Sequence, residues 1–86
     1  MAGFELRIKP SAVKEITKIP RREDRRRVVS RIQGLAADPR PGGCVKLSGR
    51  EAYRVRQGSY RIVYAVDDDE RVVCVVKVGH RRDVYR

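Results

Sequence analysis

The sequence predicts an α+β domain, with a small antiparallel β-sheet of about four to five strands and an N-terminal helical pair packed on one face. Residues 11–38 repeat apolar side chains at helical spacing, whereas residues 4–9 and 44–78 contain alternating or continuous apolar stretches of strand length. Helices at one end of a chain, followed by consecutive strands, are typical of this class. At 86 residues, the whole chain, residues 1–86, is expected to be a single domain.

Prolines delimit the first strand and the first helix. The segment FELRIK, residues 4–9, alternates in polarity and ends at Pro10, which predicts a strand. Ser11 is the expected N-cap of a short helix over residues 11–19. Pro20 then interrupts the helical pattern.

A second helix is expected over residues 21–38. Its apolar residues form one stripe suited to burial: Val28, Val29, Ile32, Leu35 and Ala36. Four arginines fall outside the stripe: Arg22, Arg26, Arg27 and Arg31. They are consistent with a solvated face, on which Glu23 and Arg27 pair at i, i+4, or with a surface that contacts phosphates.

The remaining elements are strands separated by turns. A loop is expected at residues 38–43 and a short strand at 44–47. The segment YRVRQGSYRIVY, residues 53–64, is predicted to be a hairpin, because glycine at the first of two loop positions, Gly58, suits a type II′ turn. The segment RVVCVVKV, residues 71–78, follows a DDDE turn and is nearly all apolar, as in a central strand buried on both faces.

The hairpin gathers arginine on one face. A two-residue loop pairs Arg56 with Arg61, and alternation directs Val55, Ile62 and Tyr64 to the core and Arg54, Arg56 and Arg61 to the other face. Two charges about 6 Å apart repel by about 1 kcal/mol in water and about 3 kcal/mol at an effective dielectric of 20. We interpret this face as an anion-binding site; the alternative is that the arginine stems diverge and solvent screens the repulsion.

The end of the chain is expected to approach the same face. A turn centred on Asp68 and Asp69 pairs Val76 with Arg61 and brings residues 79–86 to the hairpin turn. This register places four side chains within reach of the arginines: His80, Arg81, Arg82 and Tyr85.

Charge and composition indicate the kind of partner. The net charge is +10, and 16 of the 21 cations are arginine, whose planar fork binds phosphate through two hydrogen bonds. This favours nucleic acid first and an acidic protein second. No apolar run reaches the roughly 20 residues of a membrane helix, and the N-terminus lacks a signal-peptide pattern. Cys44 and Cys74 are read as reduced thiols, so a cytoplasmic protein with no membrane association, no metal and no cofactor is expected.

The segment YRVRQGSYRIVYAVDDDERVVCVVKVGHRRDVYR resembles the C-terminal half of RelE-type toxins of the RelE/ParE toxin–antitoxin superfamily. The match covers residues 52–86 well, and the segments before it agree in order. The resemblance implies a RelE-like fold and a type II toxin that acts as a ribosome-dependent, metal-independent mRNA endoribonuclease, an mRNA interferase that inhibits translation. In such enzymes the ribose 2′-OH attacks its own phosphate and leaves a 2′,3′-cyclic phosphate.

The resemblance also implies the catalytic residues: Arg54, Arg56, Arg61, Arg81 and Tyr85. Fixed cations stabilise charge that develops on the phosphate oxygens, and we assign this clamp to Arg56 and Arg61, with Arg54 orienting the backbone. Tyr85 is the expected proton acceptor, because neighbouring cations favour phenolate. Arg81 is expected to stabilise the leaving oxygen, and His80 is a hypothetical proton donor. Weaker RNA contacts are expected from Arg22, Arg26 and Arg82.

Two other functions fit the same residues. One is a ParE-like toxin that inhibits DNA gyrase through protein contacts and is not an enzyme. The other is an RNA-binding module without chemistry, whose steep salt dependence would match that of the nuclease. Both toxin readings imply a cognate acidic antitoxin with a flexible segment that folds on binding, and the nuclease also implies the ribosome and mRNA as partners.

Overall fold

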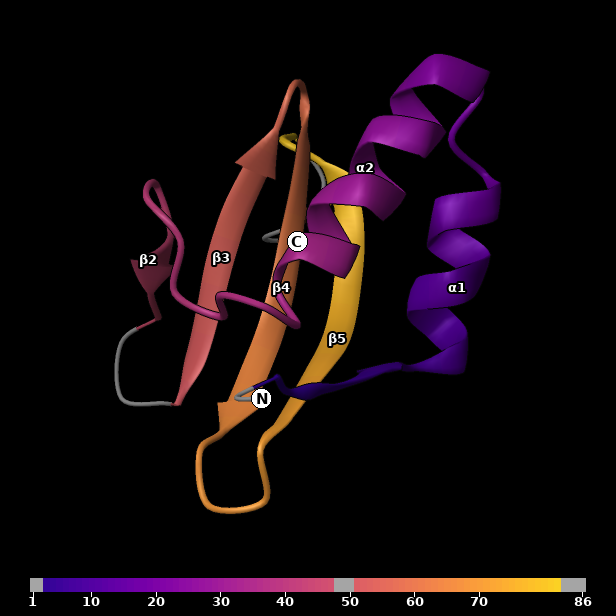
Figure 1. The fold of residues 1–86 in the computed structure, drawn as a ribbon. Helices are drawn as coiled ribbons and strands as arrows, with labels where there is room; N and C mark the ends of the chain where they lie inside the picture. Colours follow the sequence, from indigo (N-terminus) through magenta and orange to yellow (C-terminus); the bar gives the residue numbers. More distant parts are fainter. Residues whose placement is uncertain (1–2, 48–50, 83–86) are drawn as a thin grey trace.

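The computed structural model describes residues 3–47 and 51–82 and has two helices on one five-stranded sheet (Figure 1). The sheet order is β1-β5-β4-β3-β2. The α+β prediction is therefore confirmed. The elements are β1 (Glu5–Ile8), α1 (Pro10–Thr17), α2 (Arg22–Gly34), β2 (Val45–Lys46), β3 (Ala52–Gln57), β4 (Tyr60–Asp67) and β5 (Val72–His80).

The sheet is mixed, which corrects the expectation of a wholly antiparallel one. β1 runs parallel to β5, with Glu5 opposite Val72 and Ile8 opposite Val75, while β2 to β5 pair antiparallel. Parallel neighbours need a long connection between them, whereas antiparallel ones can be joined by a tight turn. The two helices carry the chain from one edge of the sheet to the other, so no hairpin turn fixes the direction of β1.

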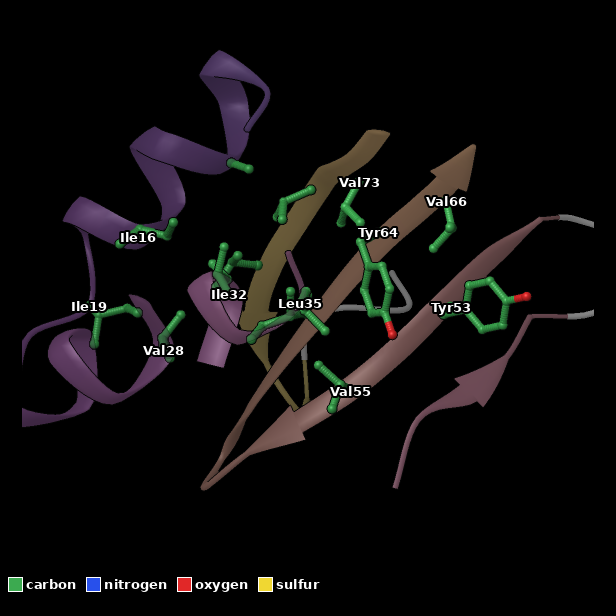
Figure 2. Packing of buried hydrophobic residues seen from close by; sticks show 14 residues of the cluster. Ile16, Ile19, Val28, Ile32, Leu35, Tyr53, Val55, Tyr64, Val66 and Val73 are labelled. Atoms are coloured by element: carbon green, nitrogen blue, oxygen red, sulfur yellow. The ribbon is translucent and has the colours of Figure 1, made fainter. Parts of the chain in front are cut away.

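The helices bury one stripe each against the sheet. Val28, Ile32 and Leu35 are at most 1% exposed, as their spacing predicts. Figure 2 shows Ile32 and Leu35 on the side of α2 toward Val55 and Tyr64, and Val28 next to Ile19. Val29 was expected in the same stripe but is 37% exposed. It lies on the next position around the helix, about 100° from Val28, and points away from the sheet.

The start of α1 differs from the prediction. The helix begins at Pro10, and Lys9 occupies the N-cap position without a side-chain capping bond. Proline suits the first helical position, because its missing N–H has no partner there and its φ is already helical. Ser11 is therefore inside the helix and is not the N-cap.

The β3–β4 hairpin has the predicted register. Arg56 lies opposite Arg61 and Val55 opposite Ile62, and Gly58 has a φ of 60°, which glycine adopts at no steric cost. Val55, Ile62 and Tyr64 are at most 1% exposed. The assignment of one face of the hairpin to the core is confirmed.

The register of β5 was predicted wrongly. Gly79, not Val76, lies opposite Arg61. The turn after β4 spans residues 68–71, since Asp67 pairs with Val72, and a bulge then shifts the register between Val63 and Tyr64. The bulge leaves Val76 without a partner in the β4 ladder, as an extra residue in one strand does.

The bulge also interrupts the burial pattern of β5. Val73, Val75 and Val78 are at most 1% exposed, so the interval between core residues lengthens from two to three across it. The backbone N–H of Val78 donates to Glu15 Oε1 of α1 at 2.9 Å. Val78 lies past the last β5 residue that pairs with β1, so a side chain of α1 satisfies this donor.

Among the described residues, neither helix is long and apolar enough to cross a bilayer.

Candidate functional site

Three arginines of the hairpin line one pocket, as the sequence predicts. The pocket has a volume of about 330 Å³, and its lining consists of Arg31, Gly43, Arg54, Arg56 and Arg61. Arg56 and Arg61 are direct cross-strand neighbours. The hairpin from Tyr53 to Tyr64 contains no acidic residue. Guanidinium groups so arranged present several forked donors to an anion.

β5 leaves space beside the pair and adds a further cation to this face. Gly79 lies opposite Arg61, so β5 contributes no side chain next to that arginine. Lys77 lies opposite Val63 in β4, and Val63 lies opposite Arg54 in β3. Because residues paired across a sheet share a face, Lys77 is on the same face as Arg54. Sequence reasoning missed Lys77, because the bulge at Val76 shifts the alternation and no residue pattern marks a bulge.

Arg31 reaches the pocket from α2 and was also missed as a member of it. Its Nη2 donates to the carbonyl oxygen of Gly42 at 3.4 Å, a long contact, and its buried Nε finds no acceptor among the described residues. A buried donor left unsatisfied costs about 1–3 kcal/mol. A signal exists in the sequence: Arg31 follows Val28 by three positions and precedes Leu35 by four, so it borders the buried stripe.

His80 lies away from the arginines, which corrects its expected position. It pairs with Tyr60, and the two rings meet edge-on with centroids 5.8 Å apart. Tyr60 and Ile62 share the face that the helices cover, whereas Arg61 lies on the other. Nδ1 of His80 accepts a hydrogen bond from the backbone N–H of Arg82 at 3.3 Å. The shifted register therefore removes His80 from the patch.

The chain beyond β5 returns to the hairpin turn, as predicted. The backbone N–H of Arg81 donates to the carbonyl oxygen of Ser59 at 2.8 Å, and the side chains of Arg81 and Arg82 are exposed. The predicted proton acceptor, Tyr85, lies outside the described residues. Arg22 and Arg26 are exposed on α2, and neither lines the arginine pocket.

The opposite end of the sheet pairs its charges. Arg40 donates to both carboxylate oxygens of Asp68, at 3.1 and 2.7 Å, and to the Tyr53 hydroxyl at 2.9 Å. The hydrogen bond from Arg40 lowers the pKa of Asp68.

The Tyr64 hydroxyl donates to the carbonyl oxygen of Pro39 at 2.7 Å, and burial raises the pKa of Tyr64.

A helical pair on a five-stranded sheet, with an arginine pocket at the hairpin, defines a small basic α+β protein suited to anionic partners. Residues 6–85 match the family described as the ParE toxin of the type II toxin–antitoxin system, parDE. The chain belongs to this family, within the RelE/ParE superfamily, and is thereby a type II toxin.

Individual relatives agree with this placement. Toxin RelG of Mycobacterium tuberculosis (strain ATCC 25618 / H37Rv) is 29% identical over 84 residues, which cover 96% of this chain and 97% of that protein. A chain of the intact E. coli RelBE toxin–antitoxin complex superposes with a TM-score of 0.76 at 30% identity, covering 90% of this chain and 95% of its own. A chain of the archaeal RelE–RelB complex from Pyrococcus horikoshii OT3 shares the fold, with a TM-score of 0.79 at 24% identity over 98% of this chain and 100% of its own.

Proposed function

We propose that this toxin is a ribosome-dependent endoribonuclease that cuts mRNA without a metal ion. The observation that carries the proposal is the placement of Arg54, Arg56 and Arg61 around one pocket, with two of them directly opposite each other across the hairpin. Cross-strand like charges destabilise a sheet, whereas a bound phosphodiester makes the same arrangement favourable. A site of this kind serves a polyanion.

The arginines support one reaction step in particular. The ribose 2′-OH attacks the adjacent phosphorus, the bond to the 5′-oxygen breaks, and the products are a 2′,3′-cyclic phosphate and a free 5′-OH. Negative charge builds on the non-bridging oxygens, and Arg56 and Arg61 stabilise it there. Arg54 orients the neighbouring backbone.

The end of the chain assists both proton transfers in this proposal. Tyr85 accepts the 2′-OH proton as phenolate, Arg81 stabilises the leaving 5′-oxygen by its charge, and water supplies the proton to that oxygen. A guanidinium group is itself a poor proton donor, since its pKa exceeds about 12. His80 has no role here, because its ring packs on Tyr60 on the other face of the sheet.

A gyrase inhibitor is the second candidate function. The family description names the ParE toxin of parDE, and a basic surface also suits protein contacts on a DNA-binding enzyme. In that case the arginine pocket takes part in binding and performs no chemistry.

An acidic antitoxin is the proposed partner under either function. Several structural relatives are chains of complexes with RelB, including those from E. coli and Pyrococcus horikoshii OT3. A +10 domain attracts an acidic segment that folds on binding. Such a segment would cover or compete for the pocket.

The deciding experiment incubates the protein with programmed ribosomes and, separately, with gyrase and a supercoiling substrate. Codon-phased cuts whose upstream fragments end in a 2′,3′-cyclic phosphate support the nuclease. Intact mRNA together with blocked supercoiling supports the gyrase inhibitor and rejects the nuclease. Metal independence is tested by treating the purified protein with EDTA and then restoring magnesium, which the pre-formed ribosome complexes require. Cleavage is expected to be unchanged by this treatment. It is then compared between ion types under conditions that keep the ribosomes intact.

A further inference from the structure

The arginine pocket is lined by more guanidinium groups than one phosphodiester requires. Four guanidinium groups line it, those of Arg31, Arg54, Arg56 and Arg61. A phosphodiester resembles a carboxylate in presenting two anionic oxygens with about four acceptor sites, and one bidentate guanidinium fills two of them. Two arginines therefore suffice for one phosphate. Arg56 and Arg61, adjacent across the hairpin, are placed to share a single one.

Arg31 has the properties of a ligand-binding side chain. It comes from α2, far from the hairpin in sequence, yet lines the same pocket. Its Nη2 makes only a long contact to the Gly42 carbonyl, at 3.4 Å, and its Nε is buried without an acceptor among the described residues. Unsatisfied buried donors in folded proteins call for an explanation such as a ligand, and an anionic oxygen in the pocket supplies the missing acceptor. Glu23, which lies earlier on α2, pairs with Arg27 at 2.7 Å and not with Arg31.

We propose that Arg31, acting with Arg54, binds the RNA phosphate next to the scissile one, so that the pocket is a two-phosphate site. This inference rests on the proposed function for the identity of the ligand as RNA and extends it to the length of chain recognised. The ligand class is a single-stranded segment with two consecutive phosphates. Because this contact forms equally in the ground state and the transition state, Arg31 contributes to KM and not to kcat.

The test uses non-cleavable 2′-deoxy oligonucleotides with one or two internal phosphates and no terminal phosphate, titrated into the protein by NMR. The wild type is expected to bind the two-phosphate ligand about tenfold more tightly than the one-phosphate ligand, because one hydrogen bond to a charged group contributes about that much to affinity. Arg31→Gln loses this gain and binds the one-phosphate ligand as the wild type does. Arg27→Gln, one helical turn earlier on α2 and outside the pocket, makes the same charge change and keeps the gain.

A second readout is steady-state cleavage of mRNA on programmed ribosomes. Arg31→Gln is expected to raise KM about tenfold with kcat unchanged, and Arg31→Lys to recover part of the loss because it restores the charge without the fork. Thermal unfolding of each variant verifies that it is folded.

The outcomes separate this inference from the proposed function. If the wild type leaves ribosome-bound mRNA intact but Arg31→Gln still loses the gain from the second phosphate, the two-phosphate site stands and the nuclease fails. A wild type without that gain overturns the two-phosphate site, as does a gain that survives in Arg31→Gln, whether or not mRNA is cut.

Discussion

The arginines at the two ends of the sheet have different neighbours. At the turn after β4, Arg40 forms a bidentate ion pair with Asp68, at 2.7 Å for the closer contact, and also contacts Tyr53. At the hairpin turn, by contrast, Arg56 faces Arg61 in a segment without acidic residues. The same residue type serves both ends, so the difference lies in what surrounds it.

On the basis of this contrast, we assign a structural role to Arg40 and propose a functional role for the hairpin arginines. Arg40 anchors the loop before β2 to the far turn, and its donors are used within the fold. Arg56 and Arg61 are like charges placed opposite each other, and in the proposed function an anion bound between them makes this arrangement favourable. Replacing an arginine at one end should therefore change stability, and replacing one at the other end should change activity.

The largest effect is expected from Arg56→Gln at the hairpin end. Cleavage of mRNA on programmed ribosomes should fall about 10²–10³-fold, as when one preorganised transition-state donor is removed. The free energy of unfolding should stay the same or rise, because the charge opposite Arg61 is gone. Arg40→Gln is the counterpart from the other end, expected to lower stability while the folded protein still cuts. If Arg56→Gln unfolds more easily and cuts normally, the contrast between the two ends is wrong.

Tyr64→Phe should produce a large loss of stability. The buried Tyr64 hydroxyl donates to the Pro39 carbonyl at 2.7 Å, and leaving that carbonyl unsatisfied costs about 1–3 kcal/mol, measurable by urea unfolding. Tyr60→Phe, on the same strand but only half-buried, is the matched control. A loss no greater than that of the control would mean that the hydroxyl contributes nothing to the fold.

The pH dependence of the same variant sharpens this prediction. Burial raises the pKa of Tyr64 in the folded state, so its contribution is fully present below the unfolded tyrosine pKa of about 10. It is lost as the pH rises through the higher folded pKa. Unfolding measured above pH 10 should therefore show a smaller alkaline loss for Tyr64→Phe than for the wild type.

Gly58→Ala tests the hairpin turn itself. Gly58 has a φ of 60°, and the added Cβ would meet no atom within 4 Å, so backbone strain alone should lower stability, by about 1–3 kcal/mol. Gly34→Ala at the end of α2 also has open space and no positive φ, and it should be neutral or stabilising. Equal effects at the two glycines would contradict the assignment of strain to the turn.

The smallest effect is expected from Asp68→Asn at the far end. The Arg40 hydrogen bond lowers the pKa of Asp68, so the contribution of this pair is present above the ordinary carboxyl pKa and is lost as the pH falls through the lowered one. Asp69→Asn removes the same charge from the same turn. Chemical unfolding should show a larger loss for Asp68→Asn at neutral pH, and the two variants should converge in acid.

Local patterns were enough to predict the hairpin and the helical stripe. The register of Arg56 with Arg61 follows from a two-residue loop and from glycine at its first position. The burial of Val28, Ile32 and Leu35 follows from 3.6 residues per turn. Both depend on residues close together in the chain, whose relative positions are fixed by backbone geometry.

Register over longer distances could not be predicted in the same way. The bulge at Val76 and the four-residue turn before β5 displaced Gly79 to the position opposite Arg61. As a result His80 packs on Tyr60, and Lys77 lies on the arginine face. An extra residue in a nearly all-apolar strand leaves no mark in the sequence, since either alternation satisfies a strand with apolar residues on both sides.

By itself, the sequence determined the class of the domain, its positive charge and the three arginines on one face of the hairpin, because these depend on composition and local periodicity. Tertiary structure alone decided that β1 joins the sheet parallel to β5, that α2 delivers Arg31 to the hairpin pocket, and that His80 lies away from it. These features depend on how distant segments pack around one core, where a shift of one residue moves a side chain to the other face of the sheet.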